Sequence, residues 1–111
     1  MQEAKAISKY VRISPRKARL VADLIRGKSV EAAQAELAFS PHKAGRLLKK
    51  TLDSAVANAE HNYDMQADDL AVVEVRVDEG PTMKRARPKC RGGRVPVMKR
   101  TSHLTVVVAA E

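Results

Sequence analysis

The residues with the clearest chemistry are a run of basic side chains near the C-terminal end of the chain. This run repels itself unless water or a polyanion neutralises it, so it predicts a phosphate-binding segment, with a solvated surface loop as the alternative. The chain has 21 Lys and Arg against 13 Asp and Glu, and the run alone accounts for the formal net charge of +8. It contains no acidic residue, and its eight cations are Lys84, Arg85, Arg87, Lys89, Arg91, Arg94, Lys99 and Arg100.

A second basic cluster surrounds the start of a predicted helix at Ser14-Pro15. Its members are Lys9, Arg12, Arg16, Lys17 and Arg19. The free backbone N–H groups at a helix start favour an anion, so a phosphate is expected against Pro15 to Lys17. An ordinary basic helix face explains the same composition, and both interpretations remain open.

Aromatic side chains are scarce, and the basic run has none. Proteins that recognise single strands commonly stack bases on aromatic rings. The basic run is therefore expected to contact nucleic acid through phosphates and shape, with help from the planar guanidinium groups of arginine.

The sequence gives little support for catalysis or metal binding. Ser102 and His103 are neighbours, so on a strand they point to opposite faces and cannot form a nucleophile–base pair. Cys90 and His103 lack the paired spacing of a zinc site, and Cys90 is interpreted as a small hairpin residue. An acidic group without any ligand-loop pattern is interpreted as the side facing away from the polyanion: Asp64, Asp68, Asp69, Glu74, Asp78 and Glu79. We predict no enzyme, no metal and no cofactor.

Length and composition predict a single domain over residues 1–111. Hydrophobic residues make up 44% of the chain, which is enough for a modest core. No apolar run approaches the ~20 residues that span a bilayer, and the N-terminal residues lack the apolar stretch of a secretory signal. A lone cysteine fits a reducing compartment. We expect a cytoplasmic protein without a membrane partner.

The first half of the chain predicts one strand and two helices. Ala4 to Ile13 alternate, with Ile7, Val11 and Ile13 on one face. Ser14-Pro15 then starts a helix that Gly27 ends, and Ser29 caps a second helix. The residues predicted to face inward from the two helices are Ala18, Val21, Leu24, Ile25, Val30, Ala33 and Leu37.

The second half predicts a long helix and two further strands. Ser40-Pro41 repeats the helix start, and apolar spacing continues to about Asn62. From Leu70 the period becomes two, with Val73, Val75 and Val77 on one face. The last strand, from Leu104, is apolar on most of both faces. The result is an α+β fold: three helices packed on a small three-stranded antiparallel sheet, with a long extended β-hairpin arm.

The arm is predicted over residues 81–100. Gly92-Gly93 is a typical turn signal, and neither half of the arm has an apolar face to bury. Pro88 and Pro96 each remove a donor from the ladder, which is tolerated only where pairing is interrupted or at an edge. Because an isolated two-stranded hairpin is at best marginal in water, we expect a partner to order it.

Four blocks of sequence resemble the bacterial type of the L-twenty-two family of large-subunit ribosomal proteins. They run from Ser14 to Lys28, Ser54 to Asn62, Val77 to Arg85 and Lys99 to Val108, in order and with compatible spacing. The similarity covers nearly the whole chain. It implies a structural RNA-binding protein of the large subunit; the alternative from the residues alone is a free-standing nucleic-acid-binding regulator.

The resemblance also implies where the chain would lie. The domain would sit near the exit of the peptide tunnel, bound to ribosomal RNA, with no homo-oligomer. Its arm would reach inward, close to the hairpin of a neighbouring ribosomal protein, and nascent peptide would pass the tip. RNA contacts would include Arg16, Lys17 and Arg19 and, on the stem, Lys84, Arg85, Lys99, Arg100, Ser102 and His103.

The tip departs from the usual family pattern, in which Gly-Arg-Ala follows the basic arm. Here the arginine is displaced by one position, which on a strand sends a side chain to the opposite face. The predicted tunnel-facing tip is Cys90, Arg91, Gly92, Gly93, Arg94, Val95 and Pro96.

Overall fold

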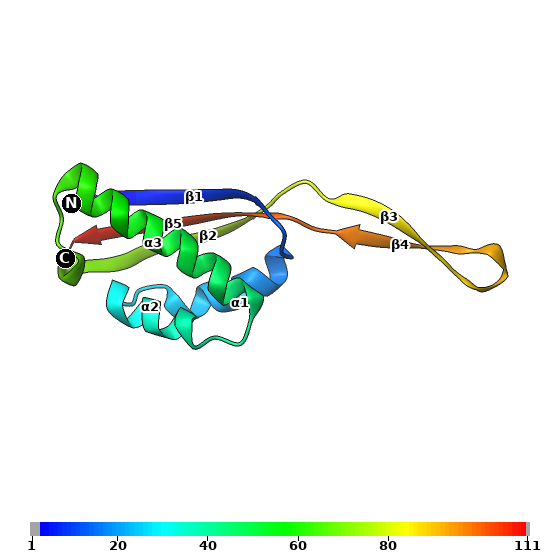
Figure 1. Cartoon of the computed structure of the whole chain (residues 1–111), viewed down its shortest axis with the longest axis horizontal. Helices are drawn as coiled ribbons and strands as arrows, with labels where there is room; N and C mark the ends of the chain where they lie inside the picture. The colour runs from blue at the N-terminus through cyan, green and yellow to red at the C-terminus, as the bar shows by residue number, and fades with distance from the viewer. Residues whose placement is uncertain (1–2, 111) are drawn as a thin grey trace.

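The computed structural model describes residues 3–110 and confirms the predicted α+β fold. Three helices accompany a three-stranded antiparallel sheet, and a separate two-stranded hairpin projects from one end (Figure 1). The elements are β1 (Glu3–Val11), α1 (Pro15–Ile25), α2 (Val30–Ala38), α3 (Lys43–Tyr63), η1 (Ala67–Asp69), β2 (Leu70–Glu79), β3 (Met83–Pro88), η2 (Cys90–Gly92), β4 (Arg94–Lys99) and β5 (Ser102–Ala110). No helix in the described part of the chain combines the length and apolar character that crossing a membrane requires.

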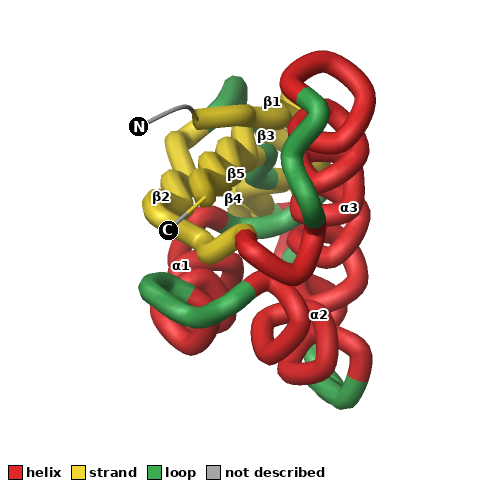
Figure 2. Tube along the Cα trace, turned by 90° about the vertical axis from the view of Figure 1, so that its left-hand side faces the viewer, coloured by secondary structure: helices red, strands yellow, loops and turns green. Residues whose placement is uncertain are grey.

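The last strand, β5, is the centre of the sheet, whose order is β1-β5-β2. Its residues from Leu104 to Ala109 are all buried, which confirms the prediction of an apolar strand buried on most of both faces. The three helices gather on one side of the strands (Figure 2), where their apolar residues form the core with the inner face of the sheet.

Ile7 does not share the inward face that Val11 and Ile13 take, because the register of β1 with β5 shifts between Ser8 and Val11. Ala4 and Ala6 are buried, whereas Ile7 is 48% exposed. Helix α3 lies against this strand, with the Ser8 and Thr51 hydroxyls 2.8 Å apart and Asn58 donating to the Lys5 carbonyl at 3.0 Å. Small alanine side chains permit this close approach, so the larger Ile7 lies on the other face.

The alternation predicted for β2 fails at a bulge. Val73 is 46% exposed and Val72 is buried, because the register with β5 shifts between Val72 and Glu74. The extra residue reverses the alternation, and Val75 and Val77 are again buried. The alternation of apolar and polar residues in the sequence does not show where such an extra residue is inserted.

Two helices also differ in detail from the prediction. In α1, Leu24 is 48% exposed and Ala22 is buried in its place. Helix α3 begins at Lys43 rather than at Ser40-Pro41, because the Ser40 hydroxyl first accepts the His42 N–H at 3.3 Å. Helix α2 is confirmed, with the Ser29 hydroxyl accepting the Ala32 N–H and Val30, Ala33 and Leu37 buried.

Candidate nucleic-acid interface

The eight cations of the predicted phosphate-binding run are all exposed in the structure. None of residues 81–100 is buried, and within the described residues none of these cations forms an ion pair with a carboxylate. The molecule measures 62 × 24 × 17 Å, and the arm gives it its length (Figure 1). The charge is therefore displayed on a narrow projection rather than neutralised by the domain.

The ladder of the arm separates its cations from one another. Arg85 pairs with Val97, Arg87 with Val95, and Lys84 with Met98, so that each paired cation faces an apolar residue across the strands. Like charges placed directly opposite would weaken the pairing. Since side chains alternate along a strand, Arg85, Arg87 and Lys99 lie on one face of the arm and Lys84 and Arg94 on the other. Both faces are therefore cationic.

The two prolines lie within the paired ladder without ending it. Pro96 faces Ala86 and Pro88 faces Arg94, two positions further along. The two pairs therefore belong to the same class of position in an antiparallel ladder. A proline is tolerated in such a ladder where its nitrogen points away from the partner strand, and both edges of this arm are free.

The turn lies one residue earlier than Gly92-Gly93 predicts. Arg91 and Gly92 have positive φ values of 63° and 75°, and the Lys89 N–H donates to the Gly93 carbonyl at 2.7 Å. The left-handed pair is thus Arg91-Gly92, and Gly93 is extended. All the residues predicted for the tip, from Cys90 to Pro96, are exposed.

The root of the arm is held by Thr101. The Gly80 N–H donates to the Thr101 carbonyl at 3.0 Å, and the Thr101 hydroxyl donates to the Pro81 carbonyl at 2.6 Å. A Cβ at position 80 would lie 2.6 Å from the Thr101 hydroxyl, so the close approach requires glycine. The register advances by one residue between Glu79 and Met83, and the arm continues the β2–β5 ribbon from this fixed root.

A groove beside the root brings the two predicted basic clusters together. This hollow of about 700 Å³, the basic groove, lies between the start of α1, the α2–α3 turn and the end of β4. Within residues 3–110, no carboxylate lines it. Leu20, Pro41 and Met98 form an apolar part of its wall. Its cations are Arg12, Lys17, Lys43, Lys99 and Arg100.

Sequence reasoning missed one of these cations, Lys43. The Lys43 ammonium donates to the Arg12 carbonyl at 2.7 Å, which fixes its position; among the residues that the structure describes, its other two N–H donors have no partner. A signal for it was present. The segment Ser-Pro-x-Lys occurs at residues 14–17 and again at residues 40–43, and both lysines line the groove.

Arg16 and Arg19 line a smaller hollow of about 400 Å³ on the other side of the α1 start. Arg100 borders this hollow as well as the basic groove, and Glu79 is the acidic residue that lines it. Arg19 is partly committed to the fold, because its Nε and Nη2 atoms donate to the Val77 carbonyl at 3.2 and 3.0 Å.

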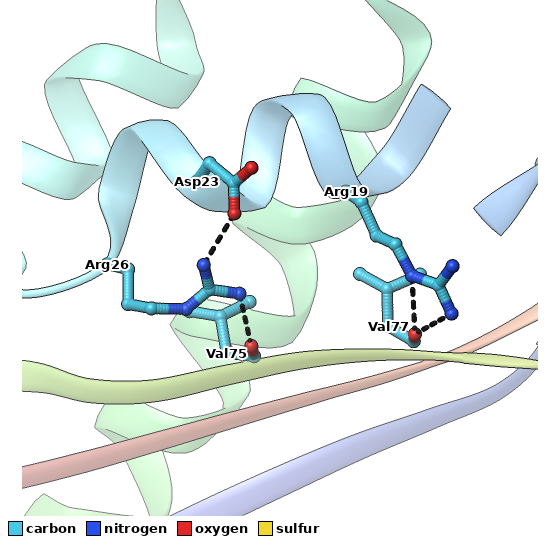
Figure 3. A network of polar contacts seen from close by, with 5 residues as sticks. All are labelled: Arg19, Asp23, Arg26, Val75 and Val77. Carbon is cyan, nitrogen blue, oxygen red and sulfur yellow. Dashed lines mark hydrogen bonds and ion pairs between the residues drawn. The ribbon is translucent and has the colours of Figure 1, made fainter. Parts of the chain in front are cut away.

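Arg26, at the end of α1, likewise donates to a carbonyl of β2 (Figure 3). Its guanidinium donates to the Val75 carbonyl at 2.7 Å and pairs with Asp23. Because β2 is an edge strand, its outward carbonyls need donors, and the Gly27 N–H supplies another to Val72. Helix α1 is therefore attached to the sheet by basic side chains as well as by apolar packing.

Three residues predicted to contact RNA lie elsewhere. Ser102 is fully buried and its hydroxyl donates to the Ile13 carbonyl at 2.7 Å. His103 is half-buried, where its Nδ1 accepts the Tyr10 N–H at 3.1 Å and its ring packs edge-on against Tyr10. Lys9 is exposed on β1 but lines neither hollow. Ser102 and His103 thus stabilise the turn at the end of β1, and their contact with RNA stays a prediction.

The acidic residues divide between two regions. Asp64, Asp68 and Asp69 lie around the end of α3 and η1, at the opposite end of the molecule from the arm (Figure 1). Glu74, Asp78 and Glu79 lie on β2, where Glu74 pairs with Arg76 at 3.0 Å and Glu79 lies beside the arm root. The first group therefore lies far from the cations of the arm, and that the acidic side faces away from a polyanion stays a prediction. No three His, Cys, Asp or Glu side chains within residues 3–110 are arranged to hold a metal ion.

Known proteins resemble this chain over nearly its whole length. Residues 6–109 match the family described as ribosomal protein L22p/L17e. A protein of Protochlamydia amoebophila (strain UWE25) called large ribosomal subunit protein uL22 is 71% identical over 109 residues, covering 98% of each chain. Proteins of the same name from Chlamydia muridarum (strain MoPn / Nigg) and Desulfitobacterium hafniense (strain DSM 10664 / DCB-2) are 62% and 61% identical, covering 94% and 97% of this chain and 94% and 95% of theirs.

Proposed function

The chain belongs to the ribosomal protein L22p/L17e family and is a structural, non-enzymatic constituent of the large ribosomal subunit, and on that premise we propose that its arm and its basic groove together bind ribosomal RNA. The family also decides against the alternative of a free-standing regulator. The partners are ribosomal RNA and other ribosomal proteins; the residues that contact each are part of the proposal.

The distribution of unpaired charge is the observation that supports this proposal. Cations on both faces of a narrow arm suit RNA that encloses the arm, because a single charged face would be enough for RNA lying on one side. The basic groove continues the same charge onto the domain through Lys99 and Arg100. The proposed RNA contacts are Arg12, Arg16, Lys17, Lys43, Lys84, Arg85, Arg87, Lys89, Arg91, Arg94, Lys99 and Arg100.

Binding of large-subunit RNA to the full chain at several salt concentrations tests this proposal. Each phosphate contact contributes about 0.7–0.9 to the slope of log affinity against log salt. Replacing Arg85 and Arg87 by Gln should lower the slope, whereas replacing Lys49 and Lys50 of α3 by Gln should change it little. Equal slopes for both variants and the parent chain would refute the role of the arm. Chemical footprinting of the RNA with and without the protein would locate the contacts.

We further propose that the tip, Cys90 to Pro96, lines the nascent-peptide tunnel near the hairpin of a neighbouring ribosomal protein. The family resemblance and the reach of the exposed arm support this position. Cys90 is the single cysteine of the chain and is exposed at the tip, so it can carry a photo-crosslinker.

Ribosomes reconstituted with the labelled protein should form crosslinks from Cys90 to a stalled nascent peptide. The matched control combines Cys90→Ser with Glu60→Cys, which moves the label to the exposed surface of α3, and should form none. Crosslinks from position 60 but not from position 90 would place the tip outside the tunnel.

A further inference from the structure

The basic groove has an apolar wall that phosphate binding alone does not explain. Leu20 is 68% exposed and Met98 is 44% exposed, yet both line a hollow bordered by five cations. The backbone of an RNA duplex offers phosphates and sugars to a protein surface. It would bind the cations but give the apolar side chains no apolar surface to pack against. The occupant should combine negative charge with a flat, weakly hydrated surface.

We propose that the basic groove takes an unstacked nucleotide of single-stranded RNA, with its base against the apolar wall and its flanking phosphates on the cations. This inference rests on the proposed function, since it specifies the form of RNA that the groove recognises. Unpaired bases in loops and bulges can leave the stack and pack against apolar side chains. The volume of about 700 Å³ falls in the range of small-ligand sites.

The placement of the cations supports this occupant. Lys17 and Lys43 come from the starts of two helices, and Lys99 and Arg100 from the arm root, so positive charge borders the groove on more than one side. The Lys43 ammonium, held by the Arg12 carbonyl, has two further N–H donors for a phosphate. Because no carboxylate in the described part of the chain lines the groove, a basic protein segment would be repelled, and the charge favours RNA.

Two exposed leucines of α1 provide a matched pair of variants. Leu20 lines the basic groove, and Leu24, one turn further along α1, does not. Both are at least 48% exposed, so Leu20→Ser and Leu24→Ser should fold and should change helix propensity alike. A difference between them reports on the groove.

The test measures binding of the full chain to a labelled pentaribonucleotide, UUAUU, and to a short RNA duplex. We expect Leu20→Ser to weaken binding of the single strand by about fivefold or more and to leave duplex binding unchanged, with Leu24→Ser affecting neither. In methyl NMR spectra the single strand should shift the Leu20 and Met98 signals further than the duplex does.

The outcomes separate this inference from the proposed function. If the two serine variants affect single-strand binding equally, or the duplex shifts the same methyl groups as far as the single strand does, the groove holds no unstacked nucleotide. If RNA-free large-subunit proteins shift the methyl signals of Leu20 and the oligonucleotide does not, the occupant is a protein segment and the inference is wrong. In either case the salt dependence of the Arg85 and Arg87 variant still decides whether the arm binds ribosomal RNA.

Discussion

The hydroxyl of Thr101 donates to the carbonyl of Pro81 at 2.6 Å and joins the two strands at the root of the arm. Thr101 is 6% exposed, so this contact belongs to the folded domain even though the arm beyond it is exposed. The Gly80 N–H, bonded to the Thr101 carbonyl, closes the same junction. The direction in which the arm leaves the sheet is thus set by the domain, before any RNA is bound.

Replacing Thr101 by Val should loosen this root while preserving the shape of the side chain. The loss of one hydrogen bond should cost about 1 kcal/mol and speed amide exchange of Gly80 about fivefold. Thr101→Ser keeps the hydroxyl and is the control, in which Gly80 exchange should stay close to that of the parent chain. Equal exchange in the Val and Ser variants would contradict a role for the hydroxyl.

Substitutions of Arg16 and Arg19 should have different effects, one on RNA binding and the other on stability. Arg19→Gln removes the two N–H donors to the Val77 carbonyl and should lower the free energy of unfolding by about 1 kcal/mol, as measured by urea denaturation. Arg16 makes no hydrogen bond or ion pair within the described residues, so Arg16→Gln should leave stability within about 0.5 kcal/mol. We expect Arg16→Gln to lower the salt slope of RNA binding. A loss of stability in Arg16→Gln together with unchanged stability in Arg19→Gln would contradict this prediction.

The free protein should exchange the amide hydrogens of its arm rapidly. None of residues 83–98 is buried, and a two-stranded ladder alone gives little protection. Strand β5, buried at the centre of the sheet, should exchange slowly in the same experiment. Strong protection of Met83 to Met98 without RNA would show that the arm is ordered by itself rather than by its partner.

Deleting Arg87 to Pro96 should leave much of the RNA binding by the domain intact. The deletion removes the tip and four of the cations but spares Thr101, the root and the basic groove. We expect weaker binding of large-subunit RNA with a smaller salt slope, and a subunit with an altered tunnel wall. A shortened chain that no longer enters the subunit would identify the arm as the principal anchor.

Local signals in the sequence predicted the elements well where a few adjacent residues decide the structure. The serine and proline at residues 14–15 started α1, and the apolar run from Leu104 predicted a strand buried on both faces. The errors fell at Ile7, Val73 and Leu24. In each case the exposed face depends on a neighbour from elsewhere in the chain or on an inserted bulge residue, and neither appears in a local period.

The candidate interface shows the same division. Concentrated charge identified the arm, because an acid-free basic run is visible without any structure. Charge could not distinguish Arg16 from Arg19, whose guanidinium is bonded to an edge strand. It also gave no reason to join Lys43 to Lys17, since 26 positions separate them along the chain.

By itself, then, the amino-acid order determined that a neutral α+β domain carries one unburied basic hairpin, because composition, helix starts and turn glycines act over a few residues. Only the tertiary structure decided that the hairpin is rooted at Thr101 and that its base closes a groove between α1 and α3. It also placed the left-handed turn at Arg91-Gly92. These features arise from packing and hydrogen bonding between distant segments, and from backbone geometry that several residue types can adopt.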